Sequence, residues 1–286
     1  MKVSRNRRAA GLLLAVPVGF VLITFGSALI LFLLESLHPS TGMGSSGEGF
    51  TLENYGRLLD SYFFEVLVRT ALISLVVTAL SLVVAYPFAL YVARYAGRFG
   101  TICLVVVLAS HGMSLVVRAL GWISILTEGG PANQALLALG LISHPIRLLD
   151  GNFALVVGLV HGFVPLFVLI LYPVLHAIDP AFERAAEGLG ASRMTVIRKI
   201  IWPLSLPGVV AASLLCFAIC MGVYTTTALL AGGRVTTFPI LVQQQISVVM
   251  NYPFGAAMAM ALLVVVMGMT WAGSACARWY AAIANP

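Results

Sequence analysis

The residues that could bind or cleave phosphate esters are scarce in this chain. Its two lysines are Lys2 and Lys199, and neither follows a glycine. A phosphate-binding loop needs a Gly-Lys-Ser/Thr run, because its backbone amides and its lysine hold the phosphate oxygens together. The chain therefore has no site of its own for ATP and magnesium, and no such cofactor is expected in it.

Other nucleophiles and bases are also poorly placed for catalysis. His111 and His161 have no carboxylate in their own segments, and the run from Gly44 to Glu48 has the composition of a loop. The cysteines lie inside apolar runs, with no CxxC pair and no histidine at metal-ligand spacing: Cys103, Cys216, Cys220 and Cys276. We expect core residues there, no metal site, and a protein that is not an enzyme.

The composition explains why the chain has so few residues that could bind or cleave a substrate. Of its 286 residues, 60% are hydrophobic and only 9% are charged, whereas soluble domains carry roughly 25% charged residues. The net charge of +6 does not predict nucleic-acid binding, since the basic residues lie at the ends of apolar runs instead of on one polar face. Lipid is the expected solvent for most of the chain.

The apolar runs are long enough for helices that cross a bilayer, which need about 20 residues each. We predict an all-α membrane protein forming a single transmembrane domain over residues 1–286. Its six spans are expected near residues 9–34, 64–93, 101–126, 153–177, 204–230 and 254–278.

Basic residues predict the orientation of these spans. With both termini, 94–100 and 178–203 in the cytoplasm, eleven of the 16 Lys and Arg residues lie on the inner side, as the positive-inside rule requires. The apolar run after Lys2, Arg5, Arg7 and Arg8 is too long for a signal peptide and lacks a small-residue cleavage site. An uncleaved first span is expected.

Two outer segments carry helix signals. Thr51 is a candidate N-cap for a short helix that runs into Leu58 and Leu59. The segment from Pro131 to Leu141 follows two glycines and has apolar residues at helical spacing. It fits an interfacial or re-entrant helix, and it equally fits a loop packed on neighbouring spans.

The inner segment 178–203 predicts two short helices joined by a tight turn. Asp179 is a good N-cap, Pro180 suits the first helical position, and Glu183 places a negative charge near the positive end of the helix. Gly190 should end this helix and Ser192 should cap the next one. The first helix has an apolar stripe at i, i+3, i+4 and i+7, formed by Phe182, Ala185, Ala186 and Leu189.

Physics alone leaves two readings of this segment, a docking surface or an amphipathic hairpin against the membrane. The run Glu183-x-Ala185-x-x-x-Leu189-Gly190-Ala191-Ser192, with Pro203-Leu204 and Leu206-Pro207-Gly208, resembles the EAA loop of ABC-importer permeases. The resemblance implies the type I importer permease fold and a first loop helix that docks on an ATP-binding subunit. It implies an ATPase-facing surface formed by Glu183, Ala185, Ala186, Leu189 and Gly190.

Further motifs extend the likeness over most of the chain. The segments Val117-Arg118-x-x-Gly121-Trp122, Leu139-Gly140-Leu141-Ile142 and Tyr252-Pro253-Phe254-Gly255 resemble the spermidine/putrescine branch of these permeases. The resemblance implies a bacterial inner-membrane subunit and alternating access. Its partners would be a second homologous permease, a dimer of ATP-binding subunits, an extracytoplasmic solute-binding protein and membrane lipid, with no nucleic acid.

Polar and aromatic residues within the spans are candidates for a solute path, because burying them in lipid is costly. We select Arg118, Trp122, Tyr224 and Thr225. Arg118 has two alternatives, reaching to the outer interface or pairing with the second permease. The fifth span contains no carboxylate, so the expected solute is a small polar compound, either polyamine-like or another amino-containing, zwitterionic or anionic molecule.

Two rival functions remain open. A secondary transporter would typically show two repeated halves and ionisable residues at mid-membrane, and we find neither a clear repeat nor a mid-membrane acid. A channel or structural subunit would leave the motif from Glu183 to Gly208 unexplained. The favoured hypothesis is a transport subunit that couples to an ATPase through its inner loop.

Overall fold

The computed structural model describes residues 2–41 and 44–284, and within these ranges the regular elements are all helices. Side chains are described from residue 15 to residue 278, apart from 42 and 43, so the basic side chains expected to anchor the N-terminus lie outside the described part. In chain order the elements are α1 Lys2–Ser36, α2 Glu53–Arg57, α3 Ser61–Arg94, α4 Phe99–His111, α5 Leu115–Leu126, α6 Pro131–Ala138, α7 Asn152–Ala177, α8 Pro180–Gly188, α9 Arg193–Val196, the π-helix η1 Ile197–Ile201, α10 Trp202–Met221, α11 Thr225–Leu230, α12 Phe238–Ser247 and α13 Tyr252–Ala284.

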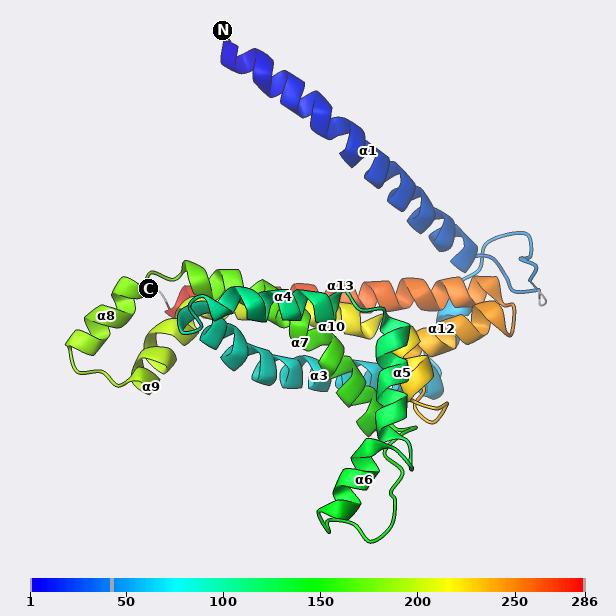
Figure 1. The fold of residues 1–286 in the computed structure, drawn as a ribbon. Coiled ribbons are helices and arrows are strands. Elements are labelled where there is room, and N and C mark those ends of the chain that lie inside the picture. The colour runs from blue at the N-terminus through cyan, green and yellow to red at the C-terminus, as the bar shows by residue number, and fades with distance from the viewer. Residues whose placement is uncertain (1, 42–43, 285–286) are drawn as a thin grey trace. The chain divides into compact units, whose positions relative to one another are not determined.

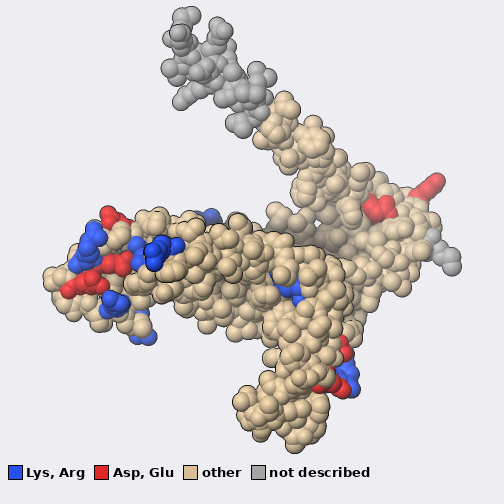
Figure 2. Space-filling model, in the orientation of Figure 1, with Lys and Arg blue, Asp and Glu red and all other residues tan. Residues whose placement is uncertain are grey.

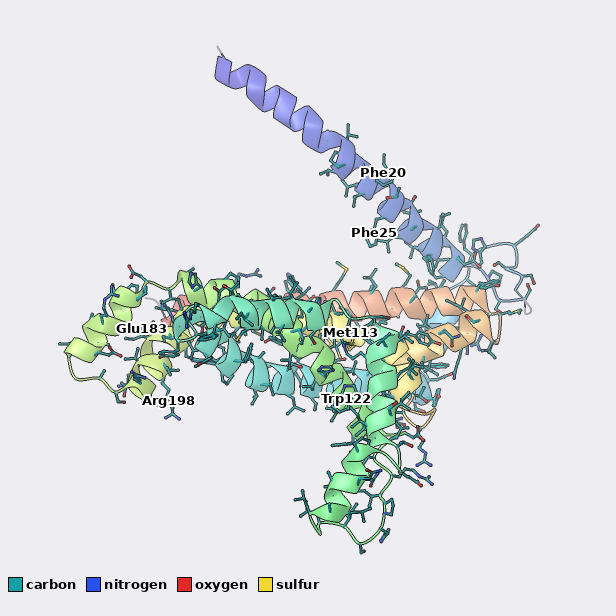
Figure 3. All side chains as sticks on the ribbon, in the orientation of Figure 1. Phe20, Phe25, Met113, Trp122, Glu183 and Arg198 are labelled. Carbon is teal, nitrogen blue, oxygen red and sulfur yellow. The ribbon has the colours of Figure 1, made fainter. Side chains whose placement is uncertain are left out.

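Five of the described helices are long and apolar enough to cross a membrane, and a sixth span results if the bent pair of α4 with the segment 115–138 counts as one. The expected third span is thus interrupted. Its two parts meet at 93° around residues 112–114, where Gly112, Met113 and Ser114 separate α4 from α5 (Figures 1 and 3). The expected fifth span ends as α10 at Met221, and α11 is a separate short helix.

The chain divides into two compact units, residues 1–64 with 241–264 and residues 65–240 with 265–286. In the first unit, the end of α1 is joined to α2 by polar contacts. Asn54 is buried and donates to the carbonyl oxygens of Ser36 and His38, and the Ser36 and Tyr55 hydroxyls lie 2.6 Å apart. The N-cap of α2 is Leu52 and not the expected Thr51, although the Thr51 hydroxyl accepts a hydrogen bond from the Glu53 amide, and the helix ends at Arg57, before Leu58 and Leu59.

In the second unit, α7 is the central helix and contacts α4, α5, α10 and α11. Its side chains Leu155, Phe167 and Leu171 are fully buried, together with Val77 and Ala85 of α3. The helix at 193–221 runs from α9 through η1 into α10. Pro203 cannot donate a backbone hydrogen bond, and the wider π turn before it accommodates the proline ring. The loop helix α9 is therefore continuous with a long membrane helix.

Candidate functional site

The start of α8 agrees with the sequence prediction. The Asp179 carboxylate accepts a hydrogen bond from the Ala181 amide at 2.8 Å, and Pro180 occupies the first helical position. Because each capping group lies within two residues of the helix start, the local sequence is sufficient to place it.

The turn between the two loop helices is also as predicted. Gly190 has φ of +84°, in the left-handed region that favours glycine. The Ala191 amide then donates back to the Ala186 carbonyl, and Ser192 caps α9 by accepting from the Thr195 amide. This geometry fixes the angle between α8 and α9.

The faces of α8 differ from the predicted apolar stripe. Phe182, Ala185 and Leu189 are exposed, and the last of these is 90% exposed. Ala186 is turned towards the core and packs against it. The helix therefore presents a narrow apolar surface to its surroundings, formed by Phe182, Ala185 and Leu189, which we call the α8 outer face.

Glu183 lies on the opposite side of α8 from this outer face. Its carboxylate is 3.1 Å from Nε of Arg94 at the end of α3, and the two side chains are 16% and 6% exposed. Arg94 also donates to the Ile178 carbonyl at 2.7 Å. Sequence reasoning missed Arg94, because a contact across 89 residues leaves no local pattern.

Charged residues gather around these loop helices, as Figure 2 shows at the end of the second unit that carries α8 and α9. Figure 3 labels Glu183 on α8 and Arg198 on η1 within this region. Both signs are present: Arg184, Glu187, Arg193, Arg198 and Lys199 are exposed there. The apolar α8 outer face is thus set in a polar, charged surface, which is the usual character of a protein interface.

Arg118, on α5, is only 8% exposed. Its guanidinium donates to the Ser110 carbonyl at 2.8 Å and more weakly to those of His111 and Met113. The carbonyls of Ser110 and His111 lie at the end of α4, where a cation is favourable, and that of Met113 lies in the bend. A Cβ at Gly162 of α7 would come within 2.9 Å of the guanidinium, so Arg118 is packed between the bend and α7.

Trp122 lies one turn along α5 from Arg118 and contacts α7. Its indole N–H donates to Nδ1 of His161 at 3.1 Å, and the two rings meet edge to face. The short helix α11 packs against both α5 and α7. Tyr224 precedes α11 and is exposed, and Thr225 begins it. The fold therefore brings the elements carrying all four solute-path candidates together.

Comparisons with known proteins give this arrangement a context. Residues 85–281 match the family described as the binding-protein-dependent transport system inner membrane component, a range that includes every candidate residue above. The chain belongs to this family. It is a permease of the ABC-importer class, a multi-pass inner-membrane protein, and a transport subunit instead of an enzyme.

Relatives of the permease include two proteins named spermidine/putrescine transport system permease protein PotB. That of Salmonella typhimurium is 34% identical over 220 residues, covering 77% of this chain and 76% of the relative. That of Escherichia coli K12 has the same identity and covers 80% of the relative. The E. coli permease protein YdcU is 26% identical, covering 89% of this chain and 85% of the relative.

Solved structures share the fold of the permease. A bacterial ABC transporter that imports alginate matches with a TM-score of 0.74 at 16% identity, covering 97% of this chain and 99% of that one. The MetNI methionine ABC transporter matches with a TM-score of 0.55 at 20% identity, covering 77% of this chain and 98% of that one. The predicted all-α, type I importer fold is confirmed.

Proposed function

We propose that this permease forms one half of a solute pathway through the inner membrane and couples to ATP hydrolysis on separate subunits. The proposed partners are a second homologous permease, two ATP-binding subunits with bound ATP and magnesium, and an extracytoplasmic solute-binding protein. The family's dependence on a binding protein supports this assembly. Both termini and the α8–α9 loop are proposed to face the cytoplasm, in line with the distribution of basic residues.

The observation that carries the proposal is the α8 outer face. Phe182 and Leu189 are 54% and 90% exposed, although α8 is held firmly by its caps, by Ala186 and by Glu183. A rigid helix loses little conformational entropy on docking, which favours binding. We propose that this face inserts into the ATP-binding subunit, with Gly190 fixing its angle and Glu183 holding α8 to its own chain.

We further propose that solute passes the wall formed by α5, α7 and α11. Trp122, Tyr224 and Thr225 would contact it, since they offer aromatic and hydroxyl groups. Arg118 would contribute by holding the bend behind Trp122, since its guanidinium is bonded to backbone carbonyls.

The proposed solute is small and polar. The PotB relatives carry spermidine and putrescine in their names, which supports an amino-containing compound. In the described part of the wall Thr225 is partly exposed, Thr226 and Thr227 are buried, and α5, α7 and α11 contain no carboxylate, which suits zwitterionic or anionic compounds as well. Uptake of labelled putrescine and of a labelled amino acid by cells with and without the permease distinguishes these classes.

Co-purification tests the assembly. The permease is extracted in mild detergent from its native membrane and its partners are identified by mass spectrometry. We expect an ATP-binding subunit and a second permease. Leu189→Glu should remove the ATP-binding subunit, because it places a charge in the apolar contact. The control is Leu139→Glu beyond α6, where Leu139 is 72% exposed.

Recovery of the permease alone, with no ATP-dependent transport in its membranes, would favour a secondary transporter. Equal loss of the ATP-binding subunit in both glutamate variants would mean that α8 is not the docking element.

A further inference from the structure

The inner end of α3 contacts the entrance of the α8–α9 loop. Arg94, the last residue of α3, donates to the carbonyl of Ile178, the residue just before the N-cap of α8. The same guanidinium pairs with Glu183 in the first turn of α8. Arg94 is only 6% exposed, so this contact is shielded from water and ions. One side chain thus holds both the backbone and a side chain at the start of α8.

The same helix also contacts the exit of the loop. Tyr86 of α3 is 8% exposed, and its hydroxyl lies 2.9 Å from that of Ser205 in the first turn of α10. Its ring packs edge to face on Trp202, the first residue of α10, with centroids 4.9 Å apart. Tyr86 and Arg94 are eight residues apart, which corresponds to about 12 Å along a helix. The two ends of the loop are therefore attached to one helical segment, residues 86–94 of α3.

We propose that Arg94 and Tyr86 are positioning residues that make α3 move together with the loop. The proposal rests on the proposed function, since the loop must be displaced by the ATP-binding subunit. Without these contacts, a displacement of α8 would pass through the Gly190 turn to α9 and the continuous α10, but not to α3. With both loop ends attached to residues 86–94, a displacement of α8 must be passed to α3, because the packed helices between the contacts resist deformation.

The proposal can be tested because a shielded ion pair responds differently to the loss of one charge and to the exchange of both. Removing one partner leaves a buried charge without compensation, whereas exchanging the two charges keeps the pair. Arg94→Glu should therefore loosen α8 from α3, and the double variant Arg94→Glu with Glu183→Arg should restore the contact. Arg98→Glu is the matched control, because Arg98 lies four residues after Arg94, beyond the end of α3, and is exposed.

The experiment uses the whole transporter, with its partner subunits, in lipid nanodiscs. Hydrogen exchange is followed by mass spectrometry with and without ATP and vanadate, in peptides from the loop, 179–192, and from the inner end of α3, 83–97. In the wild type we expect a nucleotide-dependent change in both peptides. In Arg94→Glu the loop peptide should still respond, while the α3 response should fall about twofold or more. The charge exchange should restore it and Arg98→Glu should resemble the wild type.

A full α3 response in Arg94→Glu, or no α3 response in the wild type, would overturn the inference and leave the proposed function intact. If the loop peptide of the wild type shows no nucleotide-dependent change in exchange, the proposed function itself is overturned. If Arg94→Glu does not assemble, Arg94→Lys serves in its place, because lysine keeps the charge but lacks the planar guanidinium that donates to Ile178 while lying beside Glu183. Tyr86→Phe removes only the hydroxyl that contacts Ser205 at the exit of the loop. It should independently reduce the nucleotide-dependent response of the α3 peptide.

Discussion

At the residue scale, the charged side chains inside the permease have structural partners within the chain. Arg118 was selected from the sequence because it lies in an apolar run, where a charge is costly. The structure shows three backbone carbonyls around its guanidinium. Composition could identify the residue, but its partners depend on the bend between α4 and α5, which the continuous apolar run did not predict.

Replacing Arg118 by alanine should destabilise the permease by about 2 kcal/mol, because the hydrogen bonds from its charged guanidinium to the carbonyls of Ser110, His111 and Met113 are lost. Thermal unfolding in detergent measures this as a lower Tm. Arg69→Ala is the control, since Arg69 is 42% exposed and makes an exposed ion pair with Glu65 that is worth about 0.5 kcal/mol. An unchanged Tm with lost transport would assign Arg118 to direct solute contact.

Replacing Gly190 by alanine should strain the turn after α8 by about 1 kcal/mol, because φ of +84° disfavours a Cβ. The space around it is open, so the effect comes from the backbone and not from a clash. The ATP-binding subunit should be recovered in smaller amounts on co-purification. Gly188→Ala also meets open space, has no positive φ, and should bind normally. Equal recovery from both variants would show that the turn angle is not needed.

At the scale of elements, short-range signals predicted the helix ends and long-range contacts defined the site. The N-caps at Asp179 and Ser192 lie beside the amides they bind, so sequence was sufficient. Glu183 faces its own chain because it forms an ion pair with Arg94. Trp122 contacts α7 through its hydrogen bond to His161, 39 residues away. Contacts between residues so far apart leave no periodic pattern in the sequence. The predicted apolar stripe of α8 therefore included Ala186, which packs against the core.

The segment around α6 shows how a single buried side chain organises an element. Asn133 is fully buried, donates to the carbonyls of Thr127 and Ile146, and accepts from the Ile146 amide. Sequence left this segment as either a helix or a packed loop. The structure has a short helix, α6, and the chain that returns from it is held to it at Ile146 through this carboxamide.

Asn133→Ala should loosen the segment 127–146, because the three hydrogen bonds that the Asn133 carboxamide makes to Thr127 and Ile146 are lost, each worth about 1 kcal/mol. Faster hydrogen exchange and earlier proteolytic cleavage within this segment would report it. Gln134→Ala should have little effect, since Gln134 is exposed and makes one bond to Gly129. Similar exchange in the two variants would contradict the role of Asn133.

At the scale of the whole molecule, large apolar side chains are exposed along the long helices, as expected of surfaces that meet lipid. None of the apolar window of α1 is buried, and Phe20 and Phe25 are 68% and 65% exposed. Lipid and a second subunit are the proposed cover for such a surface. Composition predicted the membrane class correctly, because 9% charged residues cannot cover a soluble surface. We propose that assembly with an ATP-binding subunit depends on the α8 outer face.

Site-specific photocrosslinking tests that central claim most directly. Benzoylphenylalanine is placed at Phe182 on α8 and, as the matched control, at Phe153 on α7; the two phenylalanines are 54% and 56% exposed. Irradiation of native membranes should crosslink position 182, and not position 153, to a subunit that mass spectrometry identifies as an ATP-binding protein. No such product from position 182, or equal products from both positions, would contradict the account.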